Sequence, residues 1–233
     1  MEQPYIFYTS PEGRMGDIIP FYEDGEFKLF FLNQGWCCVS TRDNLHFERE
    51  YRTAIHGGTG SIVKADGLYH LFYCKFPSYP YPRQQVWHAT GTDLVNWTEH
   101  PEDTFTPDGD IYLMSDWRDP HVIWNEEEQC WWMLLAAQKQ GKTMRKGCVG
   151  LCVSHDLVHW EYREPLYAPA THQSAHECPD IFRWGGLVVP DLFGLYRPLP
   201  DAIPYEPVAE GPVDHAGCGH LRYSMLLCRQ ARH

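Results

Sequence analysis

The stretch that decides the fold is residues 24–31, DGEFKLFF, because the pattern recurs along the chain. Residues 66–73 read DGLYHLFY, and residues 128–135 read EQCWWMLL more loosely. Each copy begins with turn-forming residues and continues as an aromatic-rich run typical of a β-strand. The sequence therefore predicts a hairpin at each of the three places.

A second pattern follows each copy and sets the repeat length. It reads STRDNLHF at residues 40–47, TDLVNW at 92–97 and SHDLVHW at 154–160. The aromatic residues that close it are about 50 to 60 residues apart: Phe47, Trp97 and Trp160. Such a period of short strands, with almost no helical periodicity, predicts the blades of a β-propeller with these aromatics in the core.

Length, charge and composition narrow the class of protein. The 233 residues are 43% hydrophobic and 15% aromatic, enough to build a sizeable core. The net charge of −12 disfavours nucleic acid or an anionic membrane as a partner. A neutral small-molecule or oligosaccharide substrate fits this charge better. The sequence has no bilayer-spanning run and no basic, then apolar, signal at its start, so we expect a cytoplasmic protein.

The nine cysteines form an odd set without the spacing of a zinc ribbon. We therefore expect reduced and mostly buried thiols. His172, His176 and Cys178 could ligate a metal in principle, but a fourth ligand is missing. Imidazoles beside a sugar-binding acid are the favoured interpretation, and no metal is expected.

Three short acidic motifs lie beside strand-like runs. They are Asp17 in GDIIP (16–20), Asp119 in RDP (118–120) and Glu177 in ECPD (177–180). The proline after Asp119 predicts a turn, with the acid at the end of a strand. Cleavage of a glycosidic bond needs one acid to protonate the leaving oxygen and a second carboxylate at the sugar carbon. A propeller would bring such acids together, because the strand ends of successive blades line one funnel.

The three motifs, in this order, resemble those of glycoside hydrolase family 32, the β-fructofuranosidases that include invertases, levanases and inulinases. The resemblance covers roughly residues 5–186. It implies an all-β fold, the family's N-terminal catalytic five-bladed β-propeller, of which about three to three and a half blades are present. It implies that Asp17 is the nucleophile, that Glu177 is the general acid and then base, and that Asp119 stabilises the transition state. No cofactor is implied.

Four further residues are expected to contact the sugar or to support the acids. Arg118 adjoins Asp119, and Ser61 lies in a glycine-rich segment that resembles the family's Phe-Ser-Gly-Ser stretch. Trp36 is a candidate aromatic contact, and Asp180 is a hydrogen-bonding partner near Glu177. The first motif departs from the family's Trp-Met-Asn-Asp-Pro-Asn-Gly, since Gly16 and Ile18 stand where the family has the Asn before and the Pro after the acid. This departure puts the identity of the substrate in doubt more than the nucleophile.

The chain changes character after residues 184–186, WGG. Prolines then interrupt every candidate strand and the alternation of apolar residues disappears. When the possible codons of residues 187–193 are shifted by one base, they can read Trp-Trp-Tyr-Leu-Ile-Phe-Ser, a strand of the expected kind. We therefore expect a partial glycosidase propeller at residues 1–186 and a poorly structured, out-of-frame tail at 187–233, with little activity from the chain as written.

The sequence favours retaining cleavage of terminal β-fructosyl units from sucrose or fructans. An inverting arabinan- or xylan-cleaving enzyme on the same five-bladed scaffold is the alternative within the enzymes. The stereochemistry of the product separates the two, because inversion needs carboxylates far enough apart to admit water. A non-catalytic carbohydrate-binding propeller, or an inactive fragment, is the alternative from another class.

Overall fold

A computed structural model describes residues 8–78, 84–184 and 187–193. All of these residues belong to one unit of the chain, residues 1–194. Within these ranges the regular structure consists of β-strands, which confirms the expected all-β class. No helix in the described part of the chain is long and apolar enough to cross a membrane.

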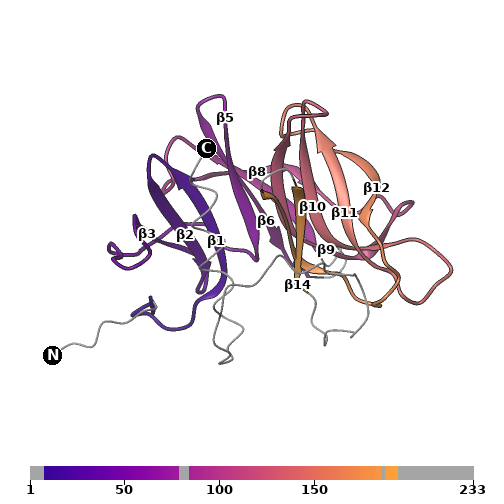
Figure 1. Ribbon diagram of the computed structural model, residues 1–233, viewed down its shortest axis with the longest axis horizontal. Helices are drawn as coiled ribbons and strands as arrows, with labels where there is room; N and C mark the ends of the chain where they lie inside the picture. Colours follow the sequence, from indigo (N-terminus) through magenta and orange to yellow (C-terminus); the bar gives the residue numbers. More distant parts are fainter. Residues whose placement is uncertain (1–7, 79–83, 185–186, 194–233) are drawn as a thin grey trace. The chain divides into compact units, whose positions relative to one another are not determined.

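The described strands form three four-stranded antiparallel sheets and one two-stranded sheet, each in sequence order (Figure 1). The first sheet contains β1 (Gly16–Glu23), β2 (Glu26–Leu32), β3 (Trp36–Thr41) and β4 (Tyr51–Arg52). The second contains β5 (Gly60–Ala65), β6 (Leu68–Lys75), β7 (Gln85–Gly91) and β8 (Thr98–Phe105). The third contains β9 (Tyr112–Asn125), β10 (Cys130–Lys139), β11 (Gly147–Ser154) and β12 (Glu161–Tyr167).

The two-stranded sheet contains β13 (Glu177–Trp184) and β14 (Leu187–Phe193). The sequence predicts no strand after residue 186, so β14 is a correction to that prediction. In the described structure β14 pairs only with β13, and a strand with one free edge tolerates Pro190, which lacks a backbone N–H. The remainder of the predicted tail, residues 194–233, lies outside the described residues.

The hairpins predicted from the repeat are confirmed. Asp24 and Gly25 both adopt left-handed backbone angles (φ 51° and 77°) between β1 and β2. Asp66 and Gly67 do the same between β5 and β6 (φ 50° and 81°). Two successive left-handed residues match the twist of the flanking strands, which explains why Asp-Gly recurs. Gln129 takes the left-handed position ahead of β10.

The second repeated pattern forms the loop after the third strand of each sheet. Its aspartate accepts hydrogen bonds from the backbone N–H groups two and three residues further on, with the same geometry each time. The aspartates are Asp43, Asp93 and Asp156. An aspartate that satisfies two backbone donors of its own loop is a local turn device, which explains its recurrence.

Successive sheets bury one another's aromatic rows. In β6, Leu71 and Tyr73 belong to a core cluster shared with the first sheet, whereas Phe72 belongs to one shared with the third. Trp97 packs against the first of these clusters and Trp160 against the second, as the repeat predicts. A sheet buried on both faces needs a neighbour on each side, which is the packing of propeller blades.

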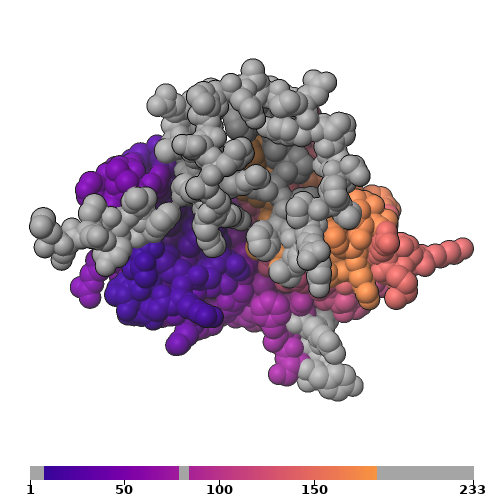
Figure 2. Space-filling view, turned by 60° about the horizontal axis from the view of Figure 1, so that its bottom comes forward, coloured from indigo at the N-terminus to yellow at the C-terminus, as the bar shows by residue number. Residues whose placement is uncertain are grey.

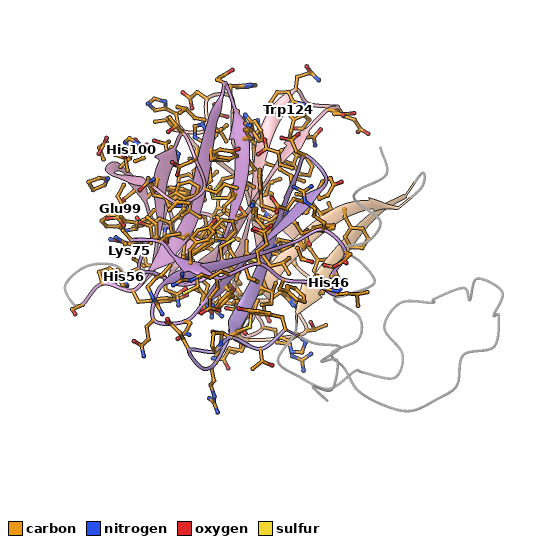
Figure 3. All side chains as sticks on the ribbon, turned by 90° about the vertical axis from the view of Figure 1, so that its left-hand side faces the viewer. His46, His56, Lys75, Glu99, His100 and Trp124 are labelled. Carbon is orange, nitrogen blue, oxygen red and sulfur yellow. The ribbon has the colours of Figure 1, made fainter. Side chains whose placement is uncertain are left out.

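The first strand of each sheet also contacts the first strand of the next, in the order β1, β5, β9, β13. These strands therefore occupy the position of the inner strands of blades. Figure 2 shows the first sheet in indigo and the third in pink to orange on one face of the molecule. Figure 3 shows that His56, Lys75, Glu99 and His100 lie together on one side of the ribbon.

Seven cysteines lie in the described ranges, and none of them forms a disulfide there. Six are buried and Cys178 is partly exposed. Burial raises the pKa of the Cys38, Cys74 and Cys148 thiols to about 12, so these side chains are inert apolar groups at neutral pH.

Candidate active site

Each of the three predicted acids lies at a β-bulge in an inner strand. The register of β1 against β2 shifts between Gly16 and Ile19, and Asp17 in this bulge has a left-handed backbone (φ 36°). The register of β13 against β14 shifts just after Glu177, where Cys178 has φ 47°. Bulges redirect side chains and favour the rims of active sites.

The third bulge corrects a prediction. Asp119 was expected in a turn at the end of a strand, but β9 runs through it without a break. The pairing with β10 skips Asp119 and Pro120, and Asp119 has φ 54°. Pro120 is tolerated because β9 is the edge strand of its sheet. The proline therefore marks a bulge within a strand and not the strand's end.

Hydrogen bonds connect these bulges to the neighbouring sheets. The Thr59 hydroxyl, just ahead of β5, donates to the Asp17 carboxylate. The backbone N–H of Cys178 donates to Asp119 Oδ2 at 3.0 Å. The structure thus brings the Asp119 carboxylate against the residue that follows Glu177.

Arg118 lies among the carboxylates. Its guanidinium is 2.8 Å from Glu177 Oε1, 2.7 Å from Asp116 Oδ1 and 3.8 Å from Asp119 Oδ2. Burial disfavours the charge, yet the contacts with these three acids keep the pKa of Arg118 above its ordinary value. The guanidinium is a rigid five-donor fork that holds Asp116 and Glu177 through two different nitrogens, whereas a lysine has a single charged nitrogen.

Asp119 is buried, and its pKa is raised. Burial is the main cause, and the charges of Glu177 and Asp17 add to it. The Cys178 N–H and Arg118 oppose the shift without cancelling it. Because both other acids act on Asp119, the three carboxylates form one electrostatic site, although they are far apart in the sequence.

Two predicted sugar contacts are placed elsewhere. The Trp36 ring is fully buried in the core, and its Nε1–H donates to the Gly58 carbonyl at 3.1 Å. Ser61 is buried, and its hydroxyl accepts a hydrogen bond from the Val122 N–H at 2.8 Å. Neither offers a surface to a sugar here, so the structure corrects both predictions: Trp36 supports the loop ahead of β5, and Ser61 joins β5 to β9.

Asp180 lies beside His121, as a supporting residue would. Its Oδ1 is 3.0 Å from His121 Nε2, without the alignment of a hydrogen bond. Burial tends to raise the pKa of Asp180, but His121 and the backbone N–H of Ile181 outweigh it and lower the pKa. The pair joins β13 to β9 on the far side of the bulge from Glu177.

Sequence reasoning missed the polar residues that surround Arg118. Gln84 Oε1 accepts a hydrogen bond from the Trp117 N–H at 2.6 Å, and Gln138 Nε2 donates to Asp116 Oδ2 at 2.5 Å. Only Asp116 carried a usable signal, since it lies two residues before Arg118 and strand alternation puts both on one face.

The described residues contain no group of histidine, cysteine and acidic side chains arranged to hold a metal ion. His172 and His176 meet edge to face, with ring centroids 5.6 Å apart. Burial, and then His172, lowers the pKa of His176. Both histidines lie in the segment that precedes Glu177.

Comparisons with known proteins show which sequences and folds this chain is similar to. The sequence model described as "Glycosyl hydrolases family 32 N-terminal domain" matches residues 104–188, which include Asp119 and Glu177. A levanbiose-producing levanase of Bacillus subtilis is 24% identical, over 57% of this chain and 38% of its own. A fructan 6-exohydrolase of Beta vulgaris is 34% identical over 27% of this chain and 12% of its own. The chain thus spans well under half of these relatives.

Solved structures share the fold. Fructan 1-exohydrolase IIa of Cichorium intybus aligns with a TM-score of 0.62 at 22% identity, covering 78% of this chain and 38% of its own. A Bombyx mori GH32 β-fructofuranosidase in complex with sucrose aligns with a TM-score of 0.59 at 23% identity, covering 75% and 40%. The sequence model thus identifies residues 104–188 as part of a glycosyl hydrolase family 32 N-terminal domain, and the solved structures share the fold of the chain.

Proposed function

We propose that this site cleaves terminal β-fructosyl units from sucrose or fructans with retention of configuration. The observation that carries the proposal is the meeting of the Asp119 and Glu177 carboxylates at Arg118, with the charge of Asp17 acting on Asp119. Retaining glycosidases use one acid for proton transfer and one carboxylate as the nucleophile.

In the first step, an Asp17 oxygen attacks the anomeric carbon of the fructosyl unit. The bond to the leaving oxygen breaks, and that oxygen takes a proton from Glu177. In the second step, Glu177 takes a proton from water, and the water oxygen displaces Asp17 from the same carbon. Fructose is released, and both acids return to their starting states.

Asp119 and Arg118 bind the sugar during both steps. A buried carboxylate that already accepts the Cys178 N–H can accept a further hydrogen bond from a sugar hydroxyl. Such a bond strengthens as positive charge develops on the sugar ring, so it stabilises the transition state more than the bound substrate.

The substrate class is proposed from the relatives. The levanase and the fructan exohydrolases are named for fructans, and the Bombyx mori enzyme is in complex with sucrose. Because the chain spans 38% of the levanase, the activity proposed is that of a whole family protein, to which this chain contributes the site.

The test is release of fructose from sucrose, inulin and levan, by the 233-residue protein and by the sequence with residues 187 onward restored to frame. Asp17→Asn and Glu177→Gln should each lower turnover by about a thousandfold or more. Exposed Asp110 provides the control, and Asp110→Asn should leave the rate unchanged. Rates near wild type in either acid variant reject that residue's role, and an inverted anomer, detected by NMR early in the reaction, rejects the retaining mechanism.

A further inference from the structure

Asp116 connects three segments that meet at the site, although it lies outside the acidic motifs. Its Oδ1 pairs with Arg118 at 2.7 Å. Its Oδ2 accepts hydrogen bonds from Gln138 Nε2 of β10 at 2.5 Å and from the backbone N–H of Ala175 at 3.3 Å. One largely buried carboxylate therefore joins β9, β10 and the loop ahead of β13.

The contact with Ala175 reaches the strand that carries the proposed acid. Ala175 is two residues before Glu177, and Arg118 holds the Glu177 carboxylate at 2.8 Å. Asp116 thus acts on Glu177 by two routes, through the loop backbone and through the guanidinium. Two attachments fix both the position of the strand's start and the direction of the carboxyl group.

We propose that Asp116 is the positioning residue that sets Glu177 for proton transfer to the leaving oxygen. This inference rests on the proposed function. Proton transfer requires hydrogen-bonding distance, and small displacements of a catalytic group lower rates strongly. Removal of Asp116 leaves the Ala175 N–H and the Gln138 amide without this acceptor. It also leaves Arg118 Nη1 with its longer hydrogen bond to Gln84 Oε1, at 3.4 Å, in place of the ion pair.

The first test is independent of activity. Hydrogen–deuterium exchange of the 233-residue protein reports on the Ala175 amide, which Asp116 protects. In Asp116→Ala, exchange at Ala175 should rise about tenfold or more, the effect of losing one hydrogen bond to a charged acceptor. Asp110→Ala, at an exposed aspartate just ahead of β9, should leave it unchanged. Unchanged exchange at Ala175 in Asp116→Ala overturns the inference.

The second test separates positioning from general damage to the fold. Sucrose needs its leaving oxygen protonated, whereas a nitrophenyl β-fructofuranoside has a leaving group that departs without a proton. Asp116→Ala should lower kcat about a hundredfold on sucrose but less than about tenfold on the nitrophenyl substrate. Asp116→Asn keeps an acceptor for Ala175 and should recover part of the loss. An equal loss on both substrates overturns the inference.

The two proposals fail in different ways. If neither substrate is cleaved by the wild-type protein, in either reading frame of the tail, the proposed function fails, and the exchange measurement still decides whether Asp116 holds the Glu177 segment. If the wild type cleaves both and Asp116→Ala changes their ratio by less than about twofold, the proposed function stands and the positioning role fails.

Discussion

Acid should destabilise this protein through a buried histidine pair in the second sheet. His70 Nδ1 is 3.0 Å from His88 Nε2, and His88 Nδ1 is 2.7 Å from Asp103 Oδ2. Since a carboxylate only accepts, a neutral His88 donates to Asp103 from Nδ1 and accepts the Nδ1–H of His70 at Nε2. A proton added to His88 Nε2 would face the proton on His70 Nδ1, so this hydrogen-bond arrangement requires a neutral His88. Burial and the neighbouring ring disfavour a charge on His70.

The surroundings of the pair give the size of the effect. Burial, then the charge of His88, lowers the pKa of His70 to about 4, while Asp66 opposes the shift and His100 adds to it. Burial also lowers the pKa of His88, against the pull of Asp103. With an ordinary pKa of 6.5 for the unfolded chain, His70 corresponds to at most about 3 kcal/mol, and about 1–2 kcal/mol after allowance for its partial exposure.

The sign follows from proton binding. The unfolded chain binds the proton more tightly than the folded protein, so this stability is complete above about pH 6.5 and is lost as the pH falls toward about 4. His70→Gln keeps a donor for His88 but cannot titrate. Between about pH 7 and pH 5 the unfolding free energy of both proteins should fall, and the fall should be about 1 kcal/mol smaller for His70→Gln than for the wild type.

Urea unfolding followed by tryptophan fluorescence at several pH values measures this difference. His46→Gln is the matched control, because His46 is exposed, follows the third strand of the first sheet and lies away from His100 (Figure 3). It should show the wild-type pH dependence. If His70→Gln and the wild type lose stability in parallel as the pH falls, the histidine pair does not carry the effect.

Three further expectations concern the site and its support. Asp119→Asn should stabilise the protein at neutral pH by about 0.5–1 kcal/mol while abolishing fructose release. The pKa of Asp119 is raised in the folded protein, so its ionised form opposes folding above that pKa, and a lower melting temperature for the variant would contradict the expectation. Gly147→Ala should lower the unfolding free energy measured in urea by about 2 kcal/mol or more, since its Cβ would lie 1.8 Å from the Ser174 carbonyl oxygen. Gly16→Ala should lower it far less, because the nearest atom is 3.5 Å from its Cβ. Equal losses would show that the segment at Ser174 moves away easily. Arg118→Lys should reduce turnover about a hundredfold, because one ammonium cannot reach both carboxylates that the guanidinium holds, and a wild-type rate in a fructose-release assay would refute that role.

The sequence predicts those parts of the fold that depend on local chemistry. Asp24-Gly25 and Asp66-Gly67 define hairpins by themselves, and the loop aspartates satisfy donors two or three residues away. The order of strands in each sheet follows from such hairpins. The order of Asp17, Asp119 and Glu177 and their association with strands could likewise be predicted from the motifs. The position of Asp119 inside β9 could not, because its proline indicated the end of a strand.

The remaining features depend on contacts between distant segments. Trp36 was predicted to face a sugar, but every residue of β3 is buried, so alternation along this strand gives no indication of which face meets solvent. Thr59 meets Asp17 across 42 residues, and Asp116 meets Ala175 across 59. No spacing rule within one strand predicts such pairs. β14 was missed because Pro190 argues against a strand only where both edges are paired.

The bulge in β9 also changes which residues of the strand share a face. Trp117 and Val122 both belong to the core cluster shared with the second sheet, although Val122 is five positions after Trp117. In a regular strand they would point to opposite faces. The extra residue at Asp119 shifts the alternation of side chains by one position, so both halves of β9 turn their apolar side chains to the same core. Deletion of Asp119 or Pro120 would leave Trp117 and Val122 four positions apart, so a regular strand would keep both side chains in the same core. The bulge itself would be lost, and with it the backbone conformation that sets the direction of the acid.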